Sequence, residues 1–196
     1  MYRLLAMISF TTIANAIEPS EEQLQELLRK EDSAAIIAYD RLQETVAKVA
    51  TNVPVMIFEG LPHQNREKTL LAEEIGSKNC MQRHHFWFYR TPIPLAVEHE
   101  KALHELLTDR SSFLANMGAK KCGGYHPDYS ICWGEGLASI EFHFCLGCHE
   151  VKIFAAGVTI YCDISDSAFP KIETILQNYH RQRPPFRSSY TPMKKL

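Results

Sequence analysis

The most informative stretch of the chain is residues 120–150, which read KKCGGYHPDYSICWGEGLASIEFHFCLGCHE. The Gly134-Glu135-Gly136 run predicts a turn between two strands. After the turn, polar and apolar residues alternate: Ile140, Phe142 and Phe144 are apolar, whereas Ser139, Glu141 and His143 are not. Since alternate strand residues point to opposite faces, we expect one face of this hairpin to pack on a core. The other face should be open to a site.

A hairpin centred on Glu135 also predicts which residues lie opposite one another. In that register Cys122 faces Cys148, and His126 faces Phe144, which lies beside Cys145. The open end of the hairpin should therefore gather a cluster of five residues, namely Cys122, His126, Cys145, Cys148 and His149.

The remaining segments predict an α+β fold, with N-terminal helices followed by an antiparallel β-meander and a C-terminal helix. Helical spacing of apolar residues marks residues 21–50, 67–75 and 97–107, and a final helix covers about 167–178. Extended segments are predicted at residues 53–58, 80–89, 129–133, 137–144, 150–155 and 158–163. Two prolines, Pro92 and Pro94, should end the 80–89 strand.

The N-terminus predicts export. Residues 1–16 combine Arg3, an apolar run and the small-x-small sequence Ala14-Asn15-Ala16, which is typical of a secretory signal peptide. The mature chain would then be one α+β domain with a helical arm at 17–180 and a basic, flexible tail at 181–196. No further apolar run approaches the roughly 20 residues that span a bilayer, so we expect no transmembrane segment in the mature chain. We expect a periplasmic or extracellular location, where disulfides persist.

Composition narrows the function classes. The 196 residues are 45% hydrophobic and 22% charged, which is typical of a globular protein rather than a disordered one. A formal net charge of -2 argues against a nucleic-acid partner, because binding phosphates needs a basic surface. Six cysteines and nine histidines stand out in a chain of this length.

The first interpretation of the cluster is structural. In an oxidising compartment six cysteines most often form three disulfides. The hairpin register favours Cys122 with Cys148 or Cys145, and Cys132 with Cys162 would link neighbouring strands. No cofactor is needed in this case.

The second interpretation is a zinc site. Cys122-x3-His126 and Cys145-x2-Cys148 are two chelating pairs that flank one hairpin, as in a zinc ribbon. Gly147 suits the tight turn between the second pair. Asp128, Glu141 or Glu150 could orient a histidine ligand.

The third interpretation is covalent haem. Residues 145–149 read CLGCH, a complete C-x-x-C-H, and these five residues resemble the attachment motif of c-type cytochromes. The resemblance implies an electron carrier in which Cys145 and Cys148 hold the porphyrin and His149 ligates iron. The extended flanks argue against it, because in an ordinary cytochrome the motif opens a helix.

Larger blocks of the sequence resemble a family of small exported bacterial proteins of unknown function. The resemblance is carried by CGGYHPDY at 122–129 and CLGCHE at 145–150, together with FEGLPH at 58–63 and YHRQRP at 179–184. It would span most of the mature chain. It implies a single exported domain and no particular activity.

No nucleotide-binding loop, Gly-x-Ser-x-Gly elbow or His-Glu-x-x-His pair is present, which favours a protein that is not an enzyme. We interpret His84-His85 as a strand segment with at most one histidine entering any site. His63 lies in a loop of the kind where function often gathers. A binding module that uses this loop and the aromatic strand is a further possibility, and it predicts an exposed apolar cleft.

Overall fold

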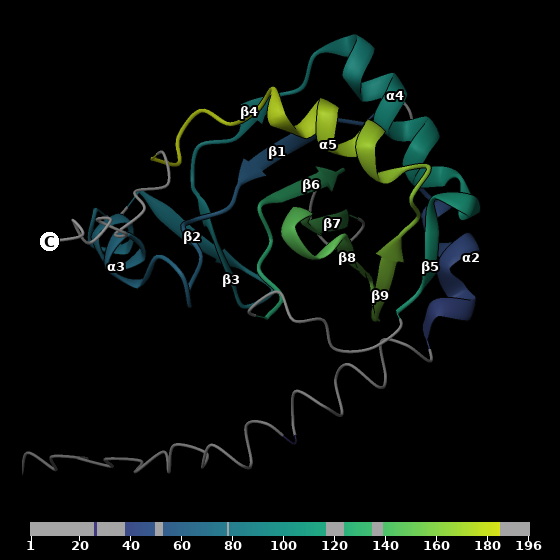
Figure 1. Ribbon diagram of the computed structural model, residues 1–196. Helices are drawn as coiled ribbons and strands as arrows, with labels where there is room; N and C mark the ends of the chain where they lie inside the picture. The colour runs from purple at the N-terminus through teal and green to yellow at the C-terminus, as the bar shows by residue number, and fades with distance from the viewer. Residues whose placement is uncertain are drawn as a thin grey trace, which may run out of the picture.

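A computed structural model describes residues 26, 38–49, 53–77, 79–116, 124–134 and 139–184 (Figure 1). Its centre is a seven-stranded antiparallel sheet with strand order β4-β1-β6-β7-β8-β9-β5. A separate two-stranded sheet, β2-β3, lies to one side of it. The predicted α+β class with an antiparallel meander and a C-terminal helix is confirmed. The predicted signal peptide, most of the 21–50 helix, Cys122 and the tail from residue 185 lie outside the described residues.

The central sheet is built around the meander β6 (Tyr129–Trp133), β7 (Ile140–Cys145), β8 (Glu150–Ala155) and β9 (Val158–Ile164). On one side it is extended by β1 (Val55–Glu59) and the two-residue β4 (Ile93–Pro94). On the other side it ends in β5 (Phe113–Ala115), a short edge strand that the sequence pattern did not predict. Pro94 is compatible with β4 because β4 is an edge strand, where a missing N–H costs no ladder bond.

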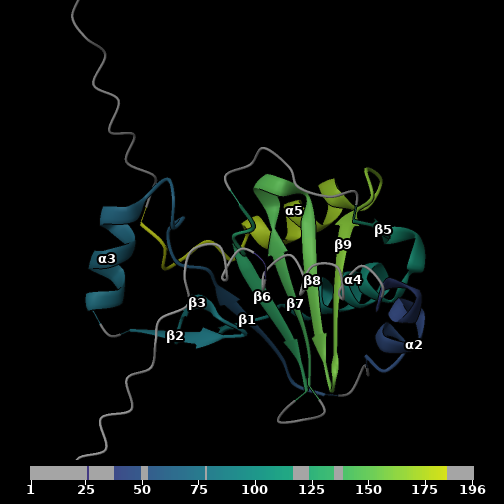
Figure 2. The ribbon, with the colours of Figure 1, turned by 90° about the horizontal axis from the view of Figure 1, so that it is seen from below.

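Helices cover one face of this sheet (Figures 1 and 2). They are α2 (Leu42–Val46), α4 (Val97–Thr108) and α5 (Phe169–Gln177), and the short 3-10 turn η1 (Ala38–Arg41) precedes α2. Their apolar residues join Ile140, Phe142 and Phe144 of β7 in the main hydrophobic core. The prediction that the even positions of β7 face the core is therefore correct. In the described residues no helix is both long and apolar enough to cross a membrane.

The opposite face of the sheet is covered by the β2-β3 hairpin, whose strands are Cys80–Arg83 and Phe86–Tyr89. The predicted single strand over 80–89 is wrong, because His84 and His85 form the turn between β2 and β3. Both have positive φ, 45° and 70°, as a two-residue hairpin turn that follows the strand twist requires. Alternation alone could not reveal this turn, since histidine is an unusual residue for it. The helix α3 (Lys68–Gly76) precedes the hairpin.

The face expected to be open is closed. Glu141 and His143 are only 6% and 0% exposed, because the hairpin lies over them. Glu141 accepts two hydrogen bonds from Arg83, and the ring of His143 packs edge-on against Phe86 and Phe88. This face of β7 is therefore a buried polar cluster rather than the floor of an open site.

The predicted hairpin register is also wrong. Tyr129 pairs with Phe144, and Ser130 pairs with His143, so the pairing is displaced by three residues from the predicted one. The turn is longer than Gly134-Glu135-Gly136, because β6 ends at Trp133 and β7 begins only at Ile140. His126 therefore precedes the paired residues and does not face Phe144.

Candidate functional site

The residues of the predicted Cys/His cluster do not share one site in the described part of the chain. The backbone N–H of His126 contacts the Cys145 thiol, but its ring bonds elsewhere: Nε2 lies 2.8 Å from the carbonyl oxygen of Leu61, and the ring stacks on His63 with centroids 4.7 Å apart. The ring of His149 stacks on Phe169 with centroids 3.6 Å apart. Among the described residues, no three His, Cys, Asp or Glu side chains are arranged to hold a metal ion.

The described cysteines differ in whether they form a disulfide. Cys80, Cys132, Cys145 and Cys162 are free and buried, so three disulfides are not formed. The predicted bond between Cys132 and Cys162 is wrong, because β6 and β9 are separated by β7 and β8, and sheet neighbours are already about 4.8 Å apart. Cys148 is disulfide-bonded.

The C-x-x-C-H run has a defined local structure. Leu146–Cys148 form a 3-10 turn, η4, between β7 and β8, and His149 follows with a φ of 56°. The run thus ends one strand and leads into the next, and opens no α-helix. Burial raises the pKa of the Cys145 thiol to about 11, so this thiol is protonated and unreactive at neutral pH. The zinc site and the haem attachment remain predictions.

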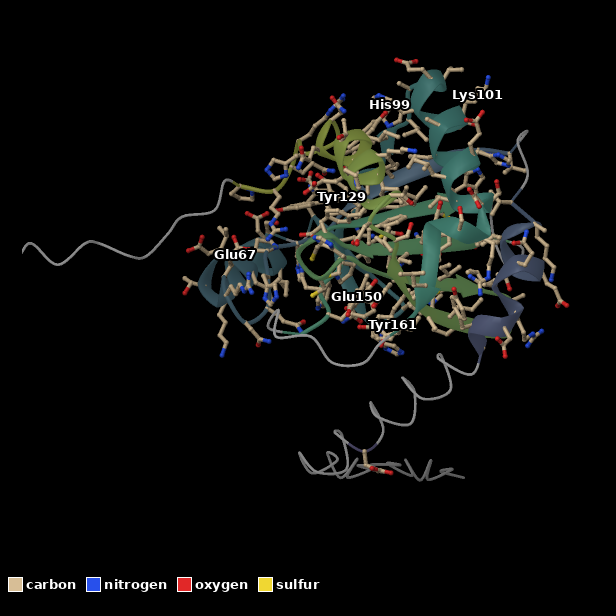
Figure 3. The ribbon with its side chains drawn as sticks, turned by 45° about the vertical axis from the view of Figure 1, so that its right-hand side comes forward. Glu67, His99, Lys101, Tyr129, Glu150 and Tyr161 are labelled. Atoms are coloured by element: carbon tan, nitrogen blue, oxygen red, sulfur yellow. The ribbon has the colours of Figure 1, made fainter. Side chains whose placement is uncertain are left out.

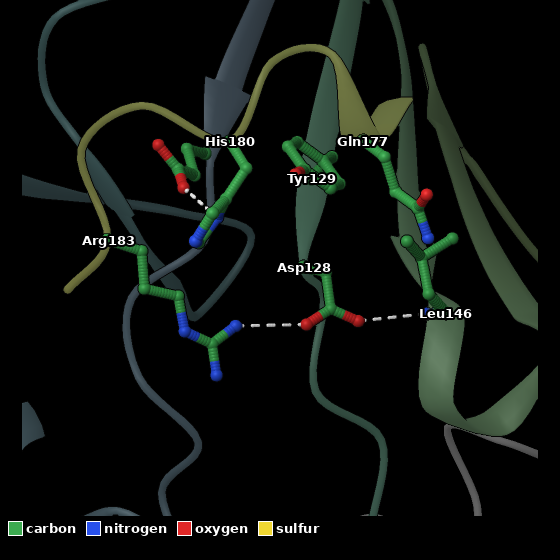
Figure 4. Close-up of a pocket in the computed structure, with 7 residues that line it drawn as sticks. Asp128, Tyr129, Leu146, Gln177, His180 and Arg183 are labelled. Carbon is green, nitrogen blue, oxygen red and sulfur yellow. Dashed lines mark hydrogen bonds and ion pairs between the residues drawn. The ribbon is translucent and has the colours of Figure 1, made fainter. Parts of the chain in front are cut away.

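A pocket of about 380 Å³ lies beside this turn (Figure 4). Its lining comes from places where elements begin or end: Glu59 ends β1, Tyr129 begins β6, Leu146 follows β7 and Gln177 ends α5. Asp128, His180 and Arg183 complete the lining. The ends of these strands and of α5 meet at one edge of the sheet. No helix or strand continues across that edge, so a hollow is left there.

Residues from four separate segments line this pocket, and the same four segments stood out in the sequence. Glu59 belongs to 58–63, Asp128 and Tyr129 to 122–129, Leu146 to 145–150, and His180 with Arg183 to 179–184. The segments are far apart in the chain, and the sheet and the end of α5 bring them together. We call these seven lining residues the Asp128 pocket.

Asp128 links the walls of the pocket. Its Oδ2 accepts a hydrogen bond from the backbone N–H of Leu146 at 2.9 Å, and its Oδ1 accepts one from Nη1 of Arg183 at 3.0 Å. Its backbone carbonyl accepts a bond from the N–H of Gly60 at 2.7 Å. One residue therefore ties the turn after β7, the end of β1 and the segment after α5 together.

Arg183 lies between two carboxylates. Its Nη2 donates to Glu67 at 2.5 Å, in addition to the bond to Asp128. Burial would raise the pKa of Glu67, but the His63 backbone N–H and the Arg183 guanidinium outweigh it and hold the pKa below its ordinary value. The predicted flexible tail therefore does not start at residue 181, since Arg183 is anchored against the folded domain.

Glu59 and His180 form a second charged pair at the pocket. Glu59 is only 1% exposed, and its Oε2 accepts hydrogen bonds from the backbone N–H groups of Arg181 and Gln182 at 3.1 and 2.6 Å. Its Oε1 lies 2.7 Å from Nδ1 of His180, whose side chain is 50% exposed. A fixed, buried carboxylate thus orients an imidazole that solvent and ligands can reach.

Two polar groups of the pocket keep hydrogen-bonding capacity. The Tyr129 hydroxyl has no hydrogen bond with any described residue, although Tyr129 is 4% exposed and lines the pocket. Burial, followed by the charges of Glu59 and Asp128, raises the pKa of Tyr129, so its hydroxyl stays protonated. Nε2 of His180 likewise bonds to no described residue, and Figure 4 shows the His180 ring at the pocket beside Tyr129.

His63 and His126 stand behind the Arg183 wall. The Nδ1 of His126 is 3.8 Å from Asp128. Burial lowers the pKa of both imidazoles, more than the attraction of Asp128 raises it, and Arg183 acts in the same direction as burial. For His63, the charge of Arg66 also lowers the pKa. Both rings are therefore neutral at neutral pH and add no positive charge beside Arg183.

Comparison with family models, with curated protein sequences and with solved structures finds no match for this chain. The fold and the pocket by themselves define an α+β protein with a small pocket at one edge of its sheet, lined by the carboxylates of Glu59 and Asp128 and by the guanidinium of Arg183. Sequence reasoning singled out His63, His126 and Asp128 but missed Glu59, Tyr129 and His180. No local motif joins these three, and only their membership of the resembling blocks could have indicated them.

Proposed function

We propose that the protein is an exported binding protein whose Asp128 pocket takes a small ligand with an apolar body and a positively charged, hydrogen-bond-donating group. The observation that carries this proposal is the meeting of four distant segments around a pocket in which the Tyr129 hydroxyl and Nε2 of His180 bond to no described residue. This differs from the binding module anticipated from the sequence, because neither His63 nor the aromatic strand at 86–89 lines the pocket.

The size of the pocket supports a small ligand. A volume of about 380 Å³ is near the lower end of the range of roughly 300–1,000 Å³ typical of ligand sites. The side chains of Tyr129, Leu146 and Gln177 supply walls of carbon atoms for an apolar body. Such walls with a few convergent polar groups are the usual composition of a binding site.

The charges support a cationic group. Glu67 and Asp128 share the guanidinium of Arg183, and Glu59 lies beside the imidazole of His180. Asp128 and Glu59 line the pocket directly. An ammonium group can donate to a carboxylate oxygen that still has a free lone pair, whereas an anion would meet repulsion.

The cysteine cluster fits a structural part of the same function. We assign Cys148 a disulfide with Cys122, one of the two pairings that the sequence favoured; the other partner, Cys145, is free. Cys148 ends the η4 turn that begins at Leu146, so a crosslink there would hold one pocket wall in place. The cluster would then serve as a staple that needs no metal.

Calorimetric titration with three isosteres of one shape tests the binding proposal. The probes are 2-(dimethylamino)ethanol, a cation at neutral pH, neutral 3-methylbutan-1-ol, and the 3-methylbutanoate anion. We expect saturable binding of the amine, at least about tenfold tighter than the neutral alcohol, which corresponds to about 1.4 kcal/mol. The proposal fails if the amine does not bind or if the carboxylate binds better.

Variants locate the binding. Tyr129→Phe removes the unsatisfied hydroxyl, and Asp128→Asn removes a charge at the pocket centre; each should weaken amine binding about tenfold, the usual scale of one lost hydrogen bond or charge contact. The matched controls are Tyr161→Phe, whose hydroxyl bonds to Glu150 at 2.7 Å, and Asp166→Asn at an exposed position. Neither control should change the affinity. Equal effects of variants and controls would place the ligand elsewhere.

A further inference from the structure

We propose that His180 is a general base, positioned by Glu59, which activates water to hydrolyse esters of the cationic ligand in the Asp128 pocket. This inference rests on the proposed binding function and adds an activity to it. No local sequence motif indicated the pair of Glu59 and His180, because Glu59 lies in β1 and His180 in the segment after α5.

The first step of the argument is that Glu59 is fixed in place. Two consecutive backbone N–H groups, those of Arg181 and Gln182, hold Oε2. Its remaining oxygen, Oε1, is buried and has no hydrogen-bond partner among the described residues. It lies 2.7 Å from Nδ1 of His180.

The second step concerns the proton on His180. A carboxylate oxygen 2.7 Å from Nδ1 favours a proton on that nitrogen, because two lone pairs would otherwise face each other. In the neutral ring, Nε2 then carries the lone pair and can accept a proton. The same arrangement, a carboxylate that orients an imidazole through Nδ1, prepares histidine bases in hydrolytic enzymes.

The third step is access. The His180 side chain is 50% exposed and lines the pocket, so water and a ligand can both reach Nε2. A purely structural role would need neither this exposure nor a histidine, since the two backbone N–H groups already attach the segment to Glu59.

Tyr129 supplies the second group that the chemistry needs. Its protonated, unpaired hydroxyl lines the same pocket and can donate a hydrogen bond to a substrate carbonyl oxygen. Such a donor stabilises the negative charge that develops on this oxygen during attack.

The reaction is balanced by the substrate and water alone. Nε2 of His180 takes a proton from water as the water oxygen bonds to the ester carbon. The tetrahedral species then collapses, its bond to the alcohol oxygen breaks, and the proton on Nε2 passes to the departing alkoxide. One water is consumed, and a carboxylic acid and an alcohol are released.

The test uses the full chain and two esters of the same shape. The acetate ester of 2-(dimethylamino)ethanol is cationic, and 3-methylbutyl acetate is its neutral counterpart. Acid release is followed in a pH-stat. We expect the cationic ester to be hydrolysed at least about tenfold faster than the neutral one at equal concentration, the discrimination expected from binding.

Variants then separate catalysis from structure. His180→Asn should lower the rate at saturating ester by about 100-fold or more, the usual effect of losing a general base, and this loss should exceed any weakening of 2-(dimethylamino)ethanol binding measured on the same variant. Glu59→Gln should also lower the rate and move the pH at which it is half-maximal. Added imidazole should restore part of the rate in His180→Gly. The control His85→Asn, at an exposed turn position of the β2-β3 hairpin, should behave as the unaltered protein.

The outcomes distinguish the two proposals. If 2-(dimethylamino)ethanol binds but its ester is not hydrolysed above the buffer rate, or if His180→Asn keeps the full rate, the general-base role is wrong and the binding function stands. If the amine itself does not bind, the binding proposal is wrong as well. Loss of hydrolysis in His180→Asn with binding retained and imidazole rescue supports both.

Discussion

Arg83 donates two hydrogen bonds to Glu141, from Nε to Oε2 at 2.9 Å and from Nη2 to Oε1 at 2.5 Å. The pair joins the β2-β3 hairpin to the middle of the central sheet, away from the Asp128 pocket. Figure 3 shows how densely side chains fill the molecule around this sheet. Because the Glu141 side chain is only 8% exposed, its charge depends on this partner.

Removing one partner of this ion pair should be more harmful than removing both. Arg83→Met leaves a buried carboxylate without its main partner, so we expect a loss of about 3–5 kcal/mol in the free energy of unfolding. The double variant Arg83→Met/Glu141→Leu should recover part of the loss, since no buried charge remains. Urea unfolding followed by circular dichroism measures both. A single variant that costs less than about 1 kcal/mol would show that the hairpin does not depend on the pair.

His143 should make the protein less stable in mild acid. Burial lowers the pKa of His143 to about 4, although the neighbouring Glu141 raises it in part; the unfolded chain titrates near the usual value of about 6.5. Between these values the unfolded state binds the extra proton, so stability is complete above about pH 6.5 and falls as the pH drops toward 4. The shift corresponds to about 3 kcal/mol.

The comparison variant for this prediction is His143→Phe, which suits the surrounding rings of Phe86, Phe88 and Phe154. Its free energy of unfolding should depend less on pH over the same window. Some dependence should remain, because His63 and His126 also have lowered pKa values. An unchanged pH profile would rule out His143 as a source of the acid sensitivity.

Gly60 should tolerate no side chain. A Cβ at this position would lie 2.1 Å from the backbone oxygen of Pro127, and a backbone atom cannot move aside. We expect Gly60→Ala to cost more than about 2 kcal/mol, as overpacking does, and to weaken amine binding, because Gly60 holds the carbonyl of Asp128. The matched control is Gly76→Ala at the end of α3, where no atom lies within 4 Å. It should be neutral or slightly stabilising; equal stability of the two variants would contradict the close packing.

The thiol count tests the assigned disulfide. Alkylation of the unfolded, unreduced protein should label Cys80, Cys132, Cys145 and Cys162, the four free cysteines. Reduction should add the two that are left of the six in the chain. Mass spectrometry of peptides gives the sites. Three disulfides would leave no thiol to label. A zinc site would leave Cys122 and Cys148 reactive after unfolding and chelation. Covalent haem would occupy Cys145 and give a Soret band.

The sequence by itself determined the local structure where one period dominates. The limits predicted for β6 and β8 match the structure, and α4 was predicted to within one residue. Alternation along 139–144 identified the core face of β7, because burying one face of a strand imposes a period of two. The tight turn predicted at Leu146-Gly147 is present as η4, but the positive φ lies at His149 and not at Gly147.

The tertiary structure decided which residues of different segments lie next to one another. The register of the β6-β7 hairpin followed from the length of its turn, which glycine positions alone do not set. The shift of three residues left His126 beside Cys145 through its backbone only, with its ring bonded to Leu61. The sequence did not predict the His84-His85 turn, because histidine seldom adopts positive φ. Glu59, Tyr129 and His180 became a site only when β1, β6 and the end of α5 met at one edge. Contacts between segments far apart in the chain depend on packing, which no local pattern encodes.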